Sequence, residues 1–462
     1  MFEPVVYRAR RSQLIKSIGS GIVFLPGHVE SPMNYIENTY PFRQDSTFLY
    51  YAGISNSGFS LVIDVDQNHT TLFGKKLTIE DIIWTGSQSD LDELGELSGV
   101  DHICESVQLS DVLLKAREQK RDVHYLPPYR AETSRQLEGL LGLETGQSLH
   151  EHSEVLASAV IASRSVKEPR ELAEIEVALD VTREMYRVAM HAVEEGKFER
   201  EIAGLVEGIA ISGGGRLAYP CILTREGQVL HNHDYHRQLR QGDLIVQDSG
   251  AATIRGYASD ITRTYPVSGA FSSRQREIYQ AVLDSLTDAT ASIRPERPFR
   301  DCHLIAARTL TDRLQQIGLM RGNVDESVAS GAHALFFPHG LGHTMGLDVH
   351  DMENLGEDLL GYDDQIERSE QFGLKSLRFG KAPAPGFVLT VEPGCYFIDP
   401  LIDQWRSKKR YEEFINYEYL EGWRGFGGVR IEENVVVTSE GCRVLGPPIP
   451  KTITNVETAC NV

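Results

Sequence analysis

The feature that most constrains this chain is the stretch at residues 336–350, which reads FFPHGLGHTMGLDVH. Three histidines fall within twelve of these residues, and three glycines lie among them. Two histidines four residues apart can share one helix face and bind zinc, as in one class of metalloproteases. Gly340 and Gly342 disfavour a helix here, and the glutamate that should follow the first histidine is missing. The pattern instead predicts a glycine-loosened strand and turn that carries imidazoles toward a substrate or an ion. Taken alone, this stretch could equally well be a surface cluster of histidines whose hydrogen bonds are already satisfied.

Length and charge restrict the class of protein. The chain has 462 residues, which is too long for one ordinary core and predicts two or three domains. Its content of 41% hydrophobic and 24% charged residues is typical of soluble globular proteins. The net charge of -20 repels phosphate backbones, so we expect no nucleic-acid partner.

Cysteine usage and the N-terminus point to a cellular compartment. The six cysteines form no CxxC pair, so neither a zinc knuckle nor a disulfide framework is indicated. The first residues include Glu3 and lack the apolar segment of a signal peptide. No apolar run approaches the roughly 20 residues that span a bilayer. We therefore expect a cytoplasmic protein with reduced thiols and no membrane partner.

Residues 1–165 are expected to form an α/β domain. The short apolar runs at 21–25 and 61–65 read as buried strands, and residues 70–73, which follow a turn, should pair with the second run. No phosphate-binding glycine loop opens a helix in this part of the chain. A nucleotide-binding role is therefore not supported.

Residues 166–462 are expected to form an α+β domain. A long amphipathic helix should begin near Pro169, because proline suits a first helical turn, and should stop at Gly196. The pattern predicts further helices at about 198–211, 273–293 and 302–317. Period-two patterning predicts strands at 244–248, 387–392 and 429–437. Two insertions rich in charge, glycine and proline are expected at 351–386 and 399–424.

Four carboxylates stand on or near these predicted strands: Asp248, Asp260, Glu392 and Glu432. Each taken singly could be a solvated acid or the partner of a nearby arginine. Together they sit among apolar neighbours, where ionised carboxylates are costly unless paired. Four acids and one imidazole converging on a cleft could not all stay ionised without cations. Two divalent ions would neutralise the four charges, and oxygen-rich ligation with one imidazole suits manganese, cobalt or zinc.

The order Asp, Asp, His, Glu, Glu is set in the segments DSG, YASDITRTYPV, HGLGH, TVEPG and VRIEE. It resembles the creatinase-like metallopeptidases of the "pita-bread" fold, which are methionine aminopeptidase, aminopeptidase P and prolidase. The resemblance covers the whole second domain. The first domain is similar to the N-terminal domain of aminopeptidase P and prolidase, especially at FRQDSTF, residues 42–48. The resemblance implies an α+β pita-bread catalytic domain, residues 166–462, preceded by a smaller α/β creatinase-type domain, residues 1–165.

This resemblance implies roles for individual residues. The metal ligands would be Asp248, Asp260, His343, Glu392 and Glu432. Two divalent ions, expected to be manganese with cobalt or zinc as alternatives, would be bridged by Asp260 and Glu432. The two aspartates are twelve residues apart, one more than is usual in the family. A β-bulge or a longer hairpin within residues 251–256 would absorb the extra residue.

Other residues would serve the substrate. His231 and His350 would hold the scissile carbonyl and the proline, and Glu392 would pass a proton to the departing nitrogen. His339 would be structural. Segments such as GLKSLR and FGGVRIEE are similar to the eukaryotic-type prolidase, in which the arginine that corresponds to Arg378 binds the C-terminal carboxylate of a dipeptide. Arg430 is a second predicted substrate-binding residue.

The expected function is hydrolysis of the Xaa-Pro bond, with a small peptide carrying proline in second position as substrate and a homodimer as the assembly. Trp84 would either reach a neighbouring subunit's cleft, as in the resembling dimers, or be a local core tryptophan. One alternative function is that of aminopeptidase P, which acts on longer peptides. Another is a non-catalytic binding module of the same fold, such as a histone chaperone, although such relatives have lost the ligands.

Overall fold

A computed structural model describes residues 1–461, which fall into two compact units. One unit comprises residues 1–164 with 354–356, and the other comprises residues 165–353 together with the chain from 357 onward. The predicted architecture, a smaller α/β domain followed by an α+β domain, is confirmed. No helix within residues 1–461 is long and apolar enough to cross a membrane.

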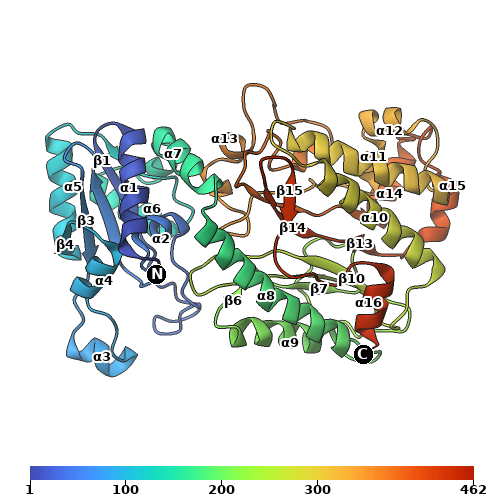
Figure 1. The fold of residues 1–462 in the computed structure, drawn as a ribbon, viewed down its shortest axis with the longest axis horizontal. Coiled ribbons are helices and arrows are strands. Elements are labelled where there is room, and N and C mark those ends of the chain that lie inside the picture. The colour runs from blue at the N-terminus through green and yellow to red at the C-terminus, as the bar shows by residue number, and fades with distance from the viewer. Residues whose placement is uncertain (462) are drawn as a thin grey trace. The chain divides into compact units, whose positions relative to one another are not determined.

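The first unit is built on a five-stranded mixed sheet with the order β4-β3-β2-β1-β5 (Figure 1). The predicted pairing of residues 70–73 with 61–65 is confirmed, because β3 runs antiparallel to β2 with Leu72 opposite Leu61. Its elements are α1 (Pro4–Ile18), β1 (Ile22–Pro26), α2 (Ser46–Ala52), β2 (Ser60–Asp64), β3 (His69–Gly74), α3 (Ile79–Thr85), α4 (Leu91–Ser98), β4 (His102–Glu105), η1 (Ser106–Gln108), α5 (Leu109–Glu118), β5 (Val123–His124), α6 (Ala131–Leu141), η2 (Gln147–Leu149) and α7 (Glu154–Ser165).

One face of this sheet packs against α5 and α6. Phe24 and Val62 on neighbouring strands are buried together with Leu113 of α5 and Leu137 of α6. By contrast, the short helix α3 buries none of its residues, and Trp84 is 81% exposed. The alternative that Trp84 is a local core tryptophan is therefore wrong. A role in a neighbouring subunit's cleft stays a prediction.

The second unit holds several small sheets, whose strand orders are β10-β8-β7, β11-β14-β15, β12-β13 and β6-β9. Its elements are α8 (Pro169–Ala192), α9 (Glu199–Ser212), β6 (Arg216–Leu217), β7 (Ile222–Thr224), β8 (Leu244–Asp248), β9 (Ala251–Ala252), β10 (Thr262–Pro266), α10 (Ser273–Ser292), α11 (Phe299–Ile317), α12 (Val324–Ser330), η3 (Ala332–Leu335), η4 (Glu353–Leu355), α13 (Glu357–Gly361), η5 (Leu374–Ser376), β11 (Val388–Val391), β12 (Gly394–Tyr396), α14 (Asp399–Ser407), α15 (Tyr417–Leu420), η6 (Glu421–Trp423), β13 (Gly428–Arg430), β14 (Glu433–Val437), β15 (Cys442–Val444) and α16 (Ile453–Cys460).

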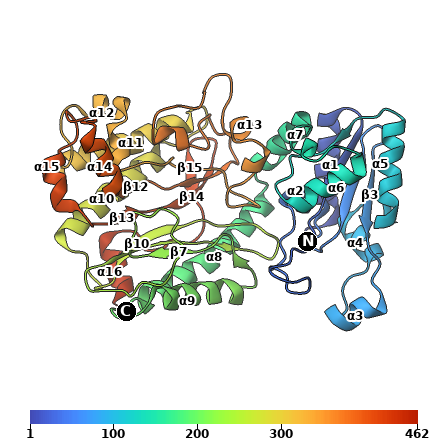
Figure 2. The ribbon, with the colours of Figure 1, turned by 180° about the vertical axis from the view of Figure 1, so that it is seen from behind.

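The strands of this unit lie between two pairs of helices. Figures 1 and 2 show α8 and α9 on one side of the strands and α10 and α11 on the other. The helix pairs cover the outer faces of the sheets, so the inner faces are free to hold functional side chains. The helices predicted from their period are confirmed, although α8 ends at Ala192 because Val193 is already extended. Gly196 lies four residues beyond that end, with a left-handed φ of 92°.

One local prediction for this unit was wrong. Residues 429–437 are not one strand but two, β13 and β14, because the chain leaves one sheet and enters another at Ile431 and Glu432. The segments 351–386 and 399–424, which are predicted to be insertions, contain short helices, and their being insertions stays a prediction. The second of them buries Trp405, which packs against Tyr411, and Trp423, which stacks on Phe397.

Candidate metal centre

Asp248 and Asp260 are brought together by a hairpin. Asp248 ends β8, which pairs antiparallel with β10 so that Asp248 lies opposite Thr262. The connection folds back on itself, with hydrogen bonds from Ser249 N to Ile261 O (3.1 Å) and from Ser259 N to Ala251 O (3.0 Å). The connection is therefore a closed hairpin that returns the chain from Asp248 to Asp260, and its absorption of the extra residue stays a prediction.

His343 lies beside Glu392 because the stretch at 336–350 runs along β11. The N–H of Thr390 donates to the carbonyl of His343 (3.0 Å), and that of Glu392 donates to Leu341 (2.8 Å). Gly342 permits this approach, since a Cβ there would lie 2.1 Å from the Thr390 carbonyl oxygen. No helix forms, as predicted.

The predicted strand in this stretch was wrong, because only an isolated bridge at Thr344 forms among the described residues. The predicted turn is confirmed. The chain reverses after Thr344, so that Asp351 N donates back to the Thr344 carbonyl (3.0 Å). This reversal brings His350 back to His343.

Glu432 is held by the neighbouring strand β10. The Arg263 guanidinium is fully buried and donates to the Glu432 carbonyl (2.5 Å) and to the Glu433 carboxylate (2.7 Å). The Thr262 hydroxyl donates to Oε2 of Glu432 (2.8 Å). Asn434 accepts from Asp260 N (3.0 Å), which ties the two segments together.

All five predicted ligands line one cavity of about 340 Å³. The Nε2 atom of His343 is 3.3 Å from Asp260 and 3.5 Å from Glu392. Ligating atoms of Asp260, His343 and Glu432 all lie within 4.8 Å of one another. The Tyr219 hydroxyl donates to Asp248 (2.6 Å) and also contacts Asp260. The four acids and the imidazole therefore converge on one cavity, as the sequence predicts.

The electrostatics of this group favour bound cations. Burial raises the pKa of Glu392 to about 7. Burial and the charges of the neighbouring acids raise the pKa of Glu432 well above its usual value. Burial alone would lower the pKa of His343, but its contacts with Asp260 and Glu392 raise it to about 9. The Oε1 atom of Glu432 is buried and has no hydrogen-bond partner within residues 1–461. Buried carboxylates of this kind, with one imidazole, fit divalent metal ions.

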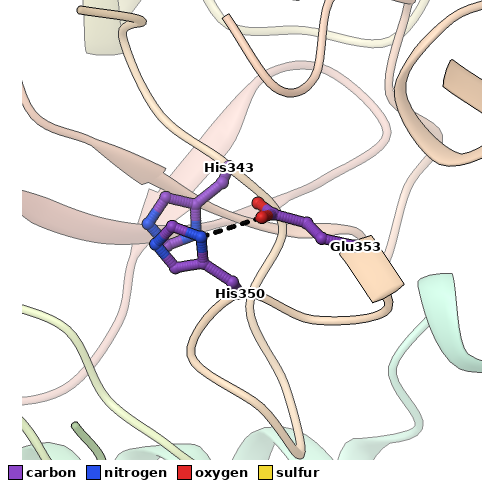
Figure 3. A group of neighbouring side chains, drawn as sticks. All are labelled: His343, His350 and Glu353. Atoms are coloured by element: carbon purple, nitrogen blue, oxygen red, sulfur yellow. Dashed lines mark hydrogen bonds and ion pairs between the residues drawn. The ribbon is translucent and has the colours of Figure 1, made fainter. Parts of the chain in front are cut away.

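The predicted substrate residues line the same cavity: His231, His350, Arg378 and Arg430. His350 lies against His343, with ring centroids 4.0 Å apart (Figure 3). Arg430 is buried and ion-paired to Asp248 at 2.7 Å, so its guanidinium already supports a predicted ligand. His339 bonds the Tyr396 hydroxyl (2.8 Å) and lines the cavity beside Arg430, which contacts the same hydroxyl.

Three residues at this site were not predicted from the sequence. Tyr219 bridges two acids, Tyr396 joins His339 to Arg430, and Glu353 bonds both His350 and Arg378. Burial opposes ionisation of Glu353, but its hydrogen bond with His350 and nearby positive charges lower its pKa. A carboxylate three residues after a predicted catalytic histidine was the only available signal. The contacts of these three residues cannot be predicted from the local sequence pattern.

Known proteins resemble this chain in both parts. The family model for metallopeptidase family M24 matches residues 173–439, and the model for the aminopeptidase P N-terminal domain matches residues 7–125. The Xaa-Pro dipeptidase of Homo sapiens is 32% identical over 98% of this chain and 90% of its own length. A probable Xaa-Pro aminopeptidase of Sordaria macrospora is 30% identical over 91% of this chain and 88% of its own.

Solved structures share the whole fold. The aminopeptidase PepP of Pseudomonas aeruginosa superposes with a TM-score of 0.81 and 27% identity, over 100% of this chain and 99% of its own. A zinc-substituted aminopeptidase P of E. coli in complex with product gives a TM-score of 0.81 and 28% identity over the same shares. The pita-bread assignment of the second domain is confirmed.

Proposed function

The chain belongs to metallopeptidase family M24, and on that premise we propose that it hydrolyses the Xaa-Pro peptide bond, with Xaa-Pro dipeptides as preferred substrates. The observation that carries this proposal is one cavity in which a buried acid-and-imidazole group faces His231, His350 and Arg378. Its volume of about 340 Å³ is near the lower end for ligand pockets, which suits a short peptide.

Asp248, Asp260, His343, Glu392 and Glu432 would hold two divalent ions, manganese first and cobalt or zinc as alternatives. Such ions supply Lewis acidity and lower the pKa of water toward neutrality. Glu392 would take the proton of the attacking water and deliver it to the proline nitrogen, a role that suits a carboxylate that lines the cavity beside His343. Glu353 accepts from Nδ1 of His350 and favours the doubly protonated imidazolium, whose Nε2–H would then donate to the carbonyl oxygen of the scissile bond.

Relatives support both forms of the activity. The Homo sapiens dipeptidase and the probable Sordaria macrospora aminopeptidase are similarly distant from this chain, at 32% and 30% identity. Arg378 favours the dipeptidase, because its guanidinium reaches the cavity wall and can pair with a terminal carboxylate. The aminopeptidase stays as the second candidate, since Arg378 already pairs with Glu353 (2.7 Å) and Glu357 (2.9 Å). A non-catalytic binding module is the third alternative, and the complete ligand set argues against it.

We further propose that the protein acts in the cytoplasm as a homodimer, with peptides rather than nucleic acids or membranes as partners. The net charge of -20 supports the exclusion of nucleic acid, because phosphate backbones would be repelled. Sedimentation and cell fractionation test the assembly and the compartment.

Replacement of Arg378 by alanine tests the dipeptide preference. If Arg378 binds the terminal carboxylate, this charge-assisted contact contributes about 1.5–3 kcal/mol. We then expect kcat/KM for Ala-Pro to fall by roughly ten- to a hundredfold. Ala-Pro amide, which lacks the carboxylate, should be a poor substrate for the parent and be little affected by Arg378→Ala. Faster cleavage of Ala-Pro-Ala than of Ala-Pro by the parent, with no effect of Arg378→Ala, would assign the protein as an aminopeptidase.

A further inference from the structure

One carboxylate links two of the residues that line the cavity. The Oε2 atom of Glu353 accepts from Nδ1 of His350 (2.9 Å) and from Nη1 of Arg378 (2.7 Å). The His350 contact is drawn in Figure 3 as a dashed line from the His350 ring to the Glu353 carboxylate. The Glu353 side chain is 12% exposed. It thus lies behind the cavity wall, and His350 and Arg378 form the wall itself.

The backbone that carries this carboxylate is held in place. Met352 is fully buried and adopts a left-handed φ of 66°, a conformation that persists only when its surroundings fix it. The preceding residue, Asp351, forms a buried ion pair with Lys167 at 3.0 Å, and its carbonyl accepts from the Thr344 hydroxyl (2.8 Å). His350 and Glu353 therefore stand on a rigid turn.

The two residues that Glu353 joins would contact opposite ends of one proline. In an Xaa-Pro dipeptide, a single proline residue separates the scissile carbonyl from the terminal carboxylate. We propose that Glu353 is a positioning residue that fixes His350 and Arg378 at the separation that a dipeptide requires. This inference rests on the proposed function and adds to it a determinant of substrate length.

The chain offers a matched control. The Oε1 atom of Glu357 also pairs with Nη1 of Arg378 at 2.9 Å, but the contacts of Glu357 include Arg368 and not His350. A carboxylate that only neutralises Arg378 would behave like Glu357. A carboxylate that also orients His350 must in addition affect the chemical step.

The test compares Glu353→Ala and Glu353→Gln with Glu357→Ala, measuring kcat and KM separately for Ala-Pro. For Glu353→Ala we expect kcat to fall about tenfold and KM to rise about tenfold, because both partners lose their orientation. Glu353→Gln keeps the acceptor without the charge and should be intermediate. Glu357→Ala should raise KM about threefold and leave kcat unchanged. Preference for Ala-Pro over Ala-Pro amide should shrink about threefold in Glu357→Ala and considerably more in Glu353→Ala.

Double variants separate the effect of Glu353 on His350 from its effect on Arg378. In an Arg378→Ala background, Glu353→Ala should still lower kcat through His350 but should no longer raise KM. Equal effects of Glu353→Ala and Glu357→Ala on kcat and KM would overturn the proposal. Crystal structures give a readout that does not depend on turnover. The side chains of His350 and Arg378 should be displaced in Glu353→Ala relative to their positions in the parent. A parent inactive on Xaa-Pro peptides would refute the proposed function, whereas unmoved side chains would refute the role of Glu353.

Discussion

Replacement of His343 by alanine is expected to lower kcat/KM for Ala-Pro by about a thousandfold and to reduce the bound metal. His343 is the one imidazole among the predicted ligands, and metal assistance lowers the activation barrier by several kcal/mol.

His350→Ala should lower kcat by about a hundred- to a thousandfold, as when one carbonyl-binding donor is lost, but should retain both ions. Steady-state kinetics with metal analysis after dialysis checks both results.

The roles of His343 and His350 are difficult to distinguish by position, because their ring centroids lie only 4.0 Å apart. His236→Ala is the control, since His236 is an exposed histidine that pairs with Asp234. It should leave both metal content and turnover as in the parent. Loss of a metal in His350→Ala but not in His343→Ala would reverse the assignment.

Replacement of Arg263 by alanine should destabilise the catalytic unit by about 3–5 kcal/mol, the usual cost of breaking a buried ion pair. Arg263 is fully buried, and its loss would leave the Glu433 carboxylate and the carbonyls of Glu432 and Ile449 without this donor. Denaturant unfolding monitored by circular dichroism gives the free energy of unfolding.

Arg443 supplies the comparison for that measurement. Its guanidinium pairs with Glu176 at 2.7 Å but is 51% exposed, so Arg443→Ala should change the free energy of unfolding by at most about 1 kcal/mol. Similar losses for the two variants would show that Arg263 does not anchor the segment that carries Glu432.

Much of the site could be predicted because its residues stand in recognisable local patterns. Asp248 closes a short strand that begins with three apolar residues, and His343 stands among glycines, which disfavour a regular helix. The long helices were predictable for the same reason, since α8 and α11 repeat their apolar residues at helical spacing.

What could not be predicted depends on contacts between distant segments. Residues 429–437 were interpreted as one alternating strand, although three consecutive polar residues, 432–434, interrupt the alternation. Pairing with two different partner strands places the change of sheet at Ile431 and Glu432. A local core position was one of the two alternatives for Trp84, yet α3 buries none of its residues. The role of Glu353 could not be predicted, because it depends on a contact with Arg378, which lies 25 residues further along the chain.

The most direct test of the central claim, that two divalent ions in this chain support Xaa-Pro hydrolysis, is metal removal followed by titration. The protein is stripped with a chelator, its metal content is measured, and Ala-Pro hydrolysis is followed as manganese is returned. We expect no turnover by the metal-free protein and recovery that reaches its plateau at two ions per chain, while Ala-Ala stays uncleaved. Undiminished hydrolysis of Ala-Pro by the metal-free protein would contradict the account.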